Sequence, residues 1–273
     1  MFDKLRIPAD SKLRETVEIM NPLGEDYSVM RTTSLNGMLT SLATNYNRRN
    51  KNVRLYELGN IYLPKQLPIT ELPEERMQFT LGMYGEGDFF SMKGVVEEFF
   101  EKIGMHEKET YDPNAGKPYL HPGRQANIIY DGKVVGYLGE VHPEVADTYG
   151  IGERAYVAVL DMPEIIPYAT FDRKYTGIAK YPAVTRDISM VVPKEILVGQ
   201  IEDVIEKKKG GAYLESYALF DLYEGSQIKA GFKSVAYSIV FRAKDKTLEE
   251  ADVTSAMNRI LKALEEMGIE LRK

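Results

Sequence analysis

Histidine is the side chain best suited to acid–base chemistry near neutral pH, and the chain has three: His106, His121 and His142. Two of them precede proline, in His121-Pro122 and His142-Pro143. A histidine there could act as a general base, but no nucleophile lies near either one in the sequence. The favoured interpretation is that both are turn or helix-entry residues.

Two other patterns could bind phosphate. Arg54 lies on a strand-like segment with Glu57, and an arginine there could hold a phosphate through paired hydrogen bonds; an ordinary solvated charge pair is favoured. Gly82–Gly87 is rich in glycine but lacks the lysine of a phosphate loop, so a hairpin or loop exit is favoured. The chain has no Walker A, His-Glu-x-x-His or Gly-x-Ser-x-Gly motif. We therefore predict no catalytic, cofactor-binding or metal-binding residue in it.

The composition is typical of a folded protein with a real core, since 44% of the residues are hydrophobic and 28% are charged. No apolar run approaches the roughly 18 residues that cross a bilayer, and we expect no membrane partner. The absence of cysteine excludes disulfides and thiolate sites and agrees with a cytoplasmic location. Net charge is −6, but from Lys174 onward there are 16 basic and 15 acidic residues, so the acidic excess lies before Lys174.

Proline and glycine indicate a boundary between two domains. Pro163, Pro167 and Pro182, with Gly177 between them, disfavour both helix and central strand. We predict one domain at 1–165, a linker at 166–179 and a second domain at 180–273.

The second domain has the element order β-α-β-β-α-β. The alternating Ile188, Met190 and Val192 indicate a strand, and a helix follows over 197–205. The later elements are two strands at Tyr213–Tyr223 and Ser234–Arg242, a helix beginning with a capping box at Thr247, and a short strand at Ile269–Arg272. This order predicts a ferredoxin-like antiparallel sheet with both helices on one face.

The first domain predicts an antiparallel sheet with helices, so the fold class is α+β. Helices are expected at Ser34–Asn47 and Phe89–Ile103. Strands are expected at Val53–Leu63, Gln78–Tyr84, Gln125–Tyr130 and Lys133–Glu140.

Residue parity sorts the two faces of the second sheet. Phe220 and Leu222 are expected to face the helices, as are four residues of the next strand, Val235, Tyr237, Ile239 and Phe241. The other face is then expected to show Leu219, Asp221, Tyr223, Ala236, Ser238 and Arg242. An open face with an aromatic ring, hydroxyls and an arginine suits unstacked bases. An exposed strand tyrosine is the alternative for Tyr223.

Several motifs in order resemble the β subunit of phenylalanyl-tRNA synthetase. In the first domain they are Asn21–Gly24, Met30–Leu35, Leu55–Tyr62, His121–Arg124 and Gly136–Pro143. In the second they are Lys180–Asp187, Phe220–Tyr223 and Lys244–Glu250, which resemble that subunit's anticodon-binding domain. The resemblance covers almost the whole chain.

The resemblance implies a class II synthetase-like sheet without an active site, because catalysis in the family belongs to a separate α subunit. The Gly-x-Gly-x-x-x-Arg element of class II catalysts is indeed missing, and the Arg54/Glu57 segment resembles a relic of the arginine-bearing strand. ATP and magnesium are implied only through the α subunit of an α2β2 assembly. The family's β subunit is far longer, so a fragment is expected.

The resemblance also implies where the partners bind. Asp221 and Tyr223 match the family's anticodon contacts for phenylalanine-specific tRNA, and Ser238, Arg242 and Arg186 join them by face or proximity. We expect the α subunit to bind the helix at Ser34–Asn47 through an exposed apolar stripe, Leu35, Met38, Leu39 and Leu42.

Two other functions stay open. The first is an independent adenylating or ligase enzyme of class II type, against which the missing arginine motif argues. The second is a free-standing tRNA- or RNA-binding module without a synthetase partner, with the first domain as its scaffold.

Overall fold

A computed structural model describes the chain except for residues 106–108, 174, 176, 208–212 and 273. The chain divides into two compact units, Met1–Lys174 and Tyr175–Lys273. The division falls inside the segment 166–179 that the prolines predict as a linker. His106 lies outside the described residues.

The first unit is built on a six-stranded antiparallel sheet with the strand order β1-β2-β6-β5-β4-β3. The strands are β1 (Val53–Leu63), β2 (Glu74–Tyr84), β3 (Thr110–Asp112), β4 (Leu120–Tyr130), β5 (Lys133–Val141) and β6 (Ala155–Asp161). A two-residue turn at Asp131-Gly132 joins β4 to β5, and both residues have positive φ, as the favoured two-residue hairpin turns require.

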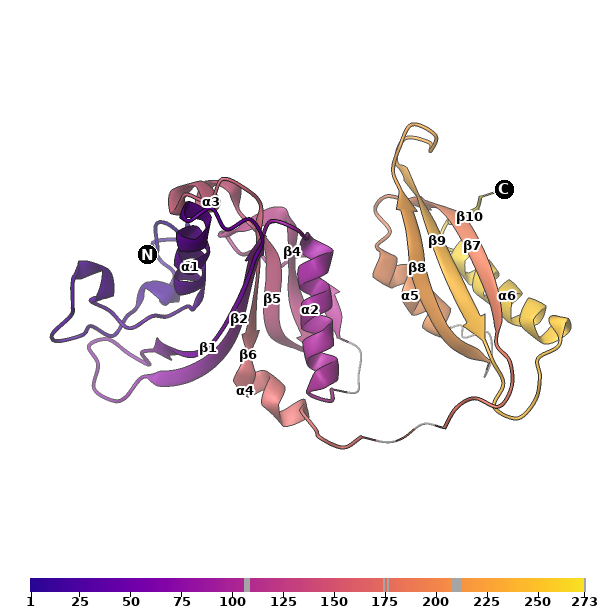
Figure 1. Cartoon of the computed structure of the whole chain (residues 1–273), viewed down its shortest axis with the longest axis horizontal. Helices are drawn as coiled ribbons and strands as arrows, with labels where there is room; N and C mark the ends of the chain where they lie inside the picture. The colour runs from indigo at the N-terminus through magenta and orange to yellow at the C-terminus, as the bar shows by residue number, and fades with distance from the viewer. Residues whose placement is uncertain (106–108, 174, 176, 208–212, 273) are drawn as a thin grey trace. The chain divides into compact units, whose positions relative to one another are not determined.

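Helices cover both faces of this sheet (Figure 1). The helix α1 (Leu35–Asn47) packs in one core with Val157 of β6, whereas α2 (Phe89–Lys102) packs in another core with the next residue, Ala158. Successive strand residues point to opposite faces, so the two helices lie on opposite sides. The shorter helices are α3 (Pro143–Tyr149), α4 (Met162–Ile165) and the 3-10 turns Lys12–Arg14, Glu25–Tyr27 and Ile166–Tyr168.

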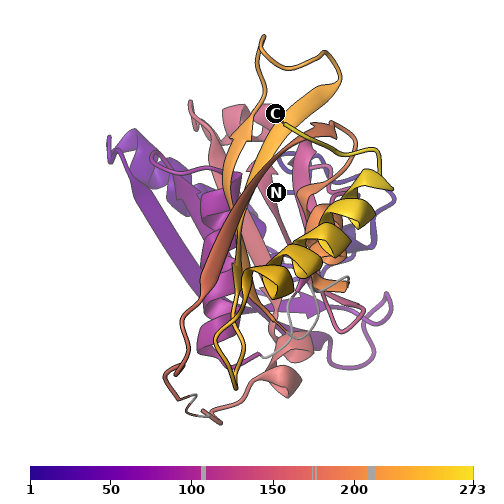
Figure 2. The same ribbon diagram turned by 90° about the vertical axis from the view of Figure 1, so that its right-hand side faces the viewer.

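The second unit is a four-stranded antiparallel sheet with the order β10-β7-β9-β8. Its elements are β7 (Val184–Pro193), α5 (Val198–Lys207), β8 (Leu214–Tyr223), β9 (Phe232–Phe241), α6 (Glu250–Glu265) and β10 (Glu270–Leu271). Both helices share one core with β7 and β9, and α6 crosses the sheet on that face (Figure 2). The predicted α+β class and the β-α-β-β-α-β order are confirmed.

One predicted helix start is wrong. The last helix begins at Glu250, and its capping residue is Glu249, whose side chain accepts from the backbone of Asp252. Thr247 lies before the helix, where the next residue, Leu248, is buried in the core. Burial of Leu248 keeps this segment extended and moves the helix start along the chain.

The apolar stripe of α1 is covered by the chain itself. Met38 is 3% exposed, and Leu39 and Leu42 are fully buried, as is Leu35. They pack with Leu5 and Ile7 and with the sheet residues Val53, Tyr84 and Val157. The expectation of an exposed stripe is therefore wrong, because an amphipathic pattern shows that a face is covered without showing what covers it.

We expect Leu42→Ala to destabilise the first unit by about 2–5 kcal/mol, because it leaves a cavity in a closed core. Ser41→Ala, on the exposed side of the same helix, should change stability little. Hydrogen exchange of the α1 amides, measured by mass spectrometry, reports the loss of stability of the first unit separately from that of the second. Equal exchange in the two variants would contradict the assignment of α1 to the core.

Candidate nucleic-acid interface

The face of the second sheet opposite its helices carries mostly small and polar side chains. The buried Ile188, Met190 and Val192 of β7 belong to the helix-side core, so their neighbours in sequence point the other way. Strand pairing adds the β9 residues across from those neighbours. The open face of β7 and β9 therefore holds Thr185, Asp187, Ser189, Val191, Ser234, Ala236, Ser238 and Val240.

The pairing of the edge strand β8 with β9 shifts register at two places, and the second shift brings residues of β8 to this face. Leu219 lies opposite Tyr237, but the register then shifts, and Asp221 lies opposite Ala236. Phe220 is the extra residue of this bulge and is 59% exposed. A bulge inserts one residue without a partner and so inverts the alternation beyond it.

The bulge decides which parity predictions hold. Asp221 and Tyr223 lie opposite Ala236 and Ser234, which places both on the open face as expected. Leu219 lies opposite the core residue Tyr237, so its expected place on the open face is wrong, and so is the expected place of Phe220 against the helices. No residue type at this position signals a bulge.

Tyr223 lies at the end of β8 with its ring over the start of the hairpin loop. A Cβ atom added to Gly225 would lie 2.1 Å from the Tyr223 hydroxyl oxygen, so the ring needs the space that glycine leaves. The side chain is part-exposed. An aromatic surface is therefore available on the sheet face that also carries Asp221.

Two arginines expected on the site are held in ion pairs. Arg242 Nε donates to both carboxylate oxygens of Glu215 at 2.9 and 3.0 Å, and its Nη1 donates to the Tyr181 carbonyl. Arg186 lies opposite Ile239, on the helix side of the sheet, and donates to Glu250 at 2.6 and 2.8 Å. The structure therefore brings Ser238 to the face of Asp221 and Tyr223 but leaves Arg186 on the other side.

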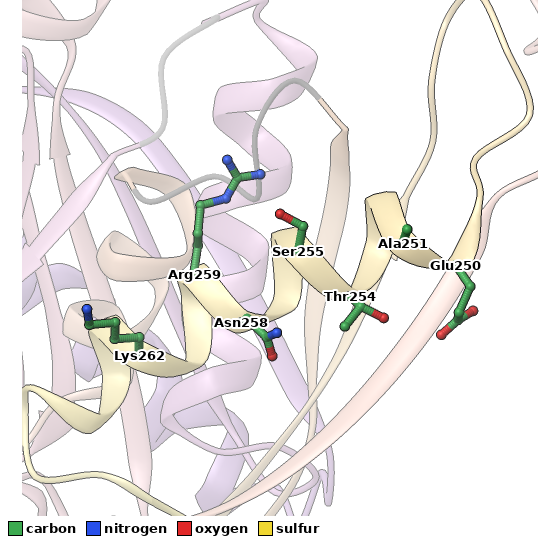
Figure 3. Close-up of a pocket in the computed structure, with 7 residues that line it drawn as sticks. All are labelled: Glu250, Ala251, Thr254, Ser255, Asn258, Arg259 and Lys262. Atoms are coloured by element: carbon green, nitrogen blue, oxygen red, sulfur yellow. The ribbon is translucent and has the colours of Figure 1, made fainter.

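A shallow hollow lies elsewhere, along the outer side of α6 (Figure 3). One helix alone supplies its lining: Glu250, Ala251, Thr254, Ser255, Asn258, Arg259 and Lys262. A small-molecule site surrounds most of its ligand, and a hollow on one helix face does not. In the part of the chain that the structure describes, no three acidic or histidine side chains could together hold a metal ion.

Both units match known families. Residues 1–162 match the family described as the phenylalanyl tRNA synthetase beta chain CLM domain, and residues 179–272 match the ferredoxin-fold anticodon binding domain. The chain belongs to the phenylalanyl-tRNA synthetase β-subunit family.

The family includes similar curated proteins. The phenylalanine–tRNA ligase β subunits of Clostridium acetobutylicum and Clostridium tetani are 46% and 45% identical over the whole chain, and that of Moorella thermoacetica is 38% identical. The chain spans about a third of the length of these relatives (34–35%). Its two units correspond to the C-terminal part of the β subunit, with its anticodon-binding domain, which confirms the resemblance.

In the synthetase-like sheet, the side chain of Arg31 is held by groups of the chain itself. Arg31 forms an ion pair with Glu57, and its Nε donates to the Asn60 carbonyl at 2.7 Å. Arg54 and Glu57 point to opposite faces of β1, so the expected pair between them is wrong. An arginine already neutralised by a carboxylate does not fit the role of holding ATP phosphates, and we derive no step through ATP for this chain.

The two described histidines have structural roles. His142 caps the N-terminus of α3, where its Nδ1 accepts from the backbone N–H of Glu144 at 3.2 Å. Burial, and then the neighbouring Arg6, lower the pKa of its imidazole, which favours the neutral ring that can accept this bond. His121 Nδ1 accepts from the Gly123 backbone N–H. Among the described residues, no helix has the length and apolar character needed to cross a membrane.

We expect Arg242→Ala to loosen the second unit, because it leaves Glu215 and the Tyr181 carbonyl without their donor. The cost should be about 1 kcal/mol, since the pair is partly exposed. Lys244→Ala removes an exposed cation two residues away and serves as the matched control. Hydrogen exchange of β8 and of residues 180–183 should rise in the first variant only. Equal exchange in both would show that the ion pair contributes nothing.

Proposed function

We propose that the second unit binds the anticodon loop of phenylalanine-specific tRNA on its open sheet face, and that the first unit binds the synthetase α subunit. The observation that carries the tRNA assignment is the juxtaposition of Asp221 and Tyr223 on a face without helices, in a domain of an anticodon-binding family. The relatives' name, β subunit, supports a second kind of subunit in the enzyme.

The geometry suits single-stranded RNA in three ways. The Tyr223 ring offers a stacking surface for a base, which requires no particular sequence. Asp221 can only accept hydrogen bonds when ionised, so it favours a base edge with an amino or imino donor. Ser238 and its neighbours on β7 and β9 are short, so they leave room for a nucleotide above the sheet.

The whole enzyme supplies what this chain lacks. In the proposed α2β2 assembly, the α subunit binds ATP and magnesium and attaches phenylalanine to the tRNA. This chain contributes tRNA binding and assembly, work that belongs to the cytoplasm of a bacterium like its relatives. Arg186 and Arg242 are satisfied within the domain, so we assign the primary contacts to Asp221 and Tyr223, with Ser238 beside them.

The partner surface of the first unit is the side of its sheet that β1 forms. β1 is an edge strand of 11 residues, and an edge strand offers free backbone donors and acceptors to another chain. A hairpin-like arm joined by the Glu18–Val29 bridge runs to Arg31, whose carbonyl accepts from Tyr62 of β1. The arm therefore ends beside the edge strand (Figure 1).

Exposed apolar side chains occur on the arm, on β1 and on the loop and strand that follow it. We call them the β1 flank; they are Ile19, Met20, Leu23 and Tyr27 of the arm, Tyr56 and Leu58 of β1, Leu67, Ile69 and Leu72 of the β1–β2 loop, and Met77 of β2. Met20 and Leu23 are 96% and 99% exposed. Exposed apolar side chains in such number mark protein interfaces, and the β1 flank takes the place of the α1 stripe as the proposed contact with the α subunit.

We expect Tyr223→Ala to weaken binding of a phenylalanine anticodon stem-loop by about 1–3 kcal/mol, the usual contribution of one base–aromatic stack. Tyr223→Phe should bind nearly as well as the parent, because stacking needs the ring and not the hydroxyl. Fluorescence anisotropy with the full chain gives both affinities. If Tyr223→Ala binds like the parent while its melting is unchanged, the tyrosine is merely an exposed strand residue.

We expect Leu58→Glu and Leu23→Glu to abolish co-purification with the α subunit while leaving thermal unfolding unchanged, because both side chains are exposed. Val134→Glu is the matched control: Val134 is about as exposed as Leu58 (54% against 56%) but lies on β5, away from the β1 flank. Loss of binding in the control alone would place the interface elsewhere. A parent chain that binds tRNA but never the α subunit would favour the free-standing RNA-binding module.

A further inference from the structure

The charges on the open face are almost all negative. The register assigns the carboxylates of Asp187, Asp221 and Glu270 to it. Of the described arginines of that parity, Arg242 is paired with Glu215, which leaves Arg272. Glu270 lies opposite Val191, and the Arg272 backbone N–H donates to the Ser189 carbonyl at 2.8 Å, so both residues share the face of Ser189 and Val191. An RNA backbone placed here meets repulsion unless one of its phosphates meets this arginine.

The Arg272 side chain reaches across the sheet toward Tyr223. Its Nη1 lies 3.5 Å from Ser234 Oγ, which is on β9, one strand beyond β7. Ser234 in turn lies directly opposite Tyr223. Neighbouring strands are about 4.8 Å apart, so the guanidinium lies roughly one strand spacing from the strand that carries Tyr223. A base and a phosphate of the same or an adjacent nucleotide can span such a distance.

The guanidinium of Arg272 is also uncompensated. Among the residues that the structure describes, no carboxylate forms an ion pair with it, whereas Arg186 and Arg242 are paired with Glu250 and Glu215. An arginine has five N–H donors, and the contact with Ser234, at the outer limit of a hydrogen bond, satisfies at most one. The residue is exposed, so the remaining donors are accessible to a ligand.

The side chains on the sheet between Arg272 and Asp221 are small. The two lie in one row across the sheet, separated only by Ser189 of β7 and Ala236 of β9. Neither of these side chains is large enough to keep a ribose-phosphate away from the guanidinium. The row therefore offers an acceptor for a base at one end and a donor for a phosphate at the other.

We infer that Arg272 binds a backbone phosphate of the nucleotide that stacks on Tyr223 or of its neighbour, and so fixes the register of the RNA on the open face. This rests on the proposed tRNA binding by that face. A guanidinium can donate two parallel, charge-assisted hydrogen bonds to two oxygens of one phosphate, and such bonds are strong. The sequence offers no pattern that singles Arg272 out, because only strand pairing brings the end of the chain to this face.

The test compares two arginines on opposite sides of one domain. Arg272→Ala removes the proposed contact, and Arg259→Ala removes an arginine on the outer side of α6 that has no ion-pair partner among the described residues (Figure 3). Binding of the full chain to stem-loops with the phenylalanine anticodon or a scrambled one is measured by anisotropy at several salt concentrations. Melting of each variant is checked separately.

Arg272→Ala should weaken both stem-loops alike, by roughly tenfold, and lower the slope of log affinity against log salt by about 0.7, the value for one phosphate on a single strand. Arg272→Lys should recover part of the affinity and the slope, because it keeps the charge. Arg259→Ala should stay within about twofold of the parent, as a contact-free position does.

Three results would overturn the inference. Parent-like binding by Arg272→Ala shows that no phosphate is held there. A loss confined to the phenylalanine anticodon shows a base contact instead, and an equal loss in Arg259→Ala shows a diffuse effect of charge. If the parent chain binds neither stem-loop, the proposed tRNA binding itself fails, which is a distinct outcome from a parent that binds and an Arg272→Ala variant that is unchanged.

Discussion

The arrangement of the second unit depends on the buried side of β9. Val235, Tyr237, Ile239 and Phe241 are fully buried against α5 and α6, and a one-residue slip would turn all of them toward solvent. This constraint fixes the register of both neighbouring strands. Because β9 cannot move, the extra residues of β8 must be absorbed by β8 itself, and the bulge at Phe220 then turns Asp221 and Tyr223 to the open face.

The sheet of the first unit, unlike that of the second, has helices packed on both faces. It is covered by α1 on one side and α2 on the other, so the described part of the unit leaves no broad sheet face for a ligand. Its polar groups close on one another: Arg31 pairs with Glu57, and the Ser34 hydroxyl donates to Gln78 at 2.7 Å. What remains unsatisfied is an edge and its apolar surroundings, which suits a unit that binds another protein rather than a nucleotide.

The sequence predicts well wherever one face of an element is buried and the other exposed. Ile188, Met190 and Val192 show a strand for this reason, whereas β6 escapes prediction because it is buried on both sides and has no alternation. The pattern of apolar residues in α1 correctly shows that one face of the helix is buried, but it does not show which residues bury that face. The bulge at Phe220 and the position of Arg272 depend on pairing between distant segments, which local patterns do not contain.

An acidic open face has a consequence for selectivity. A surface of many free lysines and arginines would hold any RNA, because phosphates are common to all sequences. Here the carboxylates of Asp187, Asp221 and Glu270 repel a backbone that lies in the wrong register, and rejection of wrong partners is as effective as attraction of the right one. At physiological ionic strength these charges act over about 8 Å, which is less than two strand spacings. A single uncompensated arginine near the stacking ring is therefore enough to favour one placement of the strand, even though the chain as a whole carries a net charge of −6.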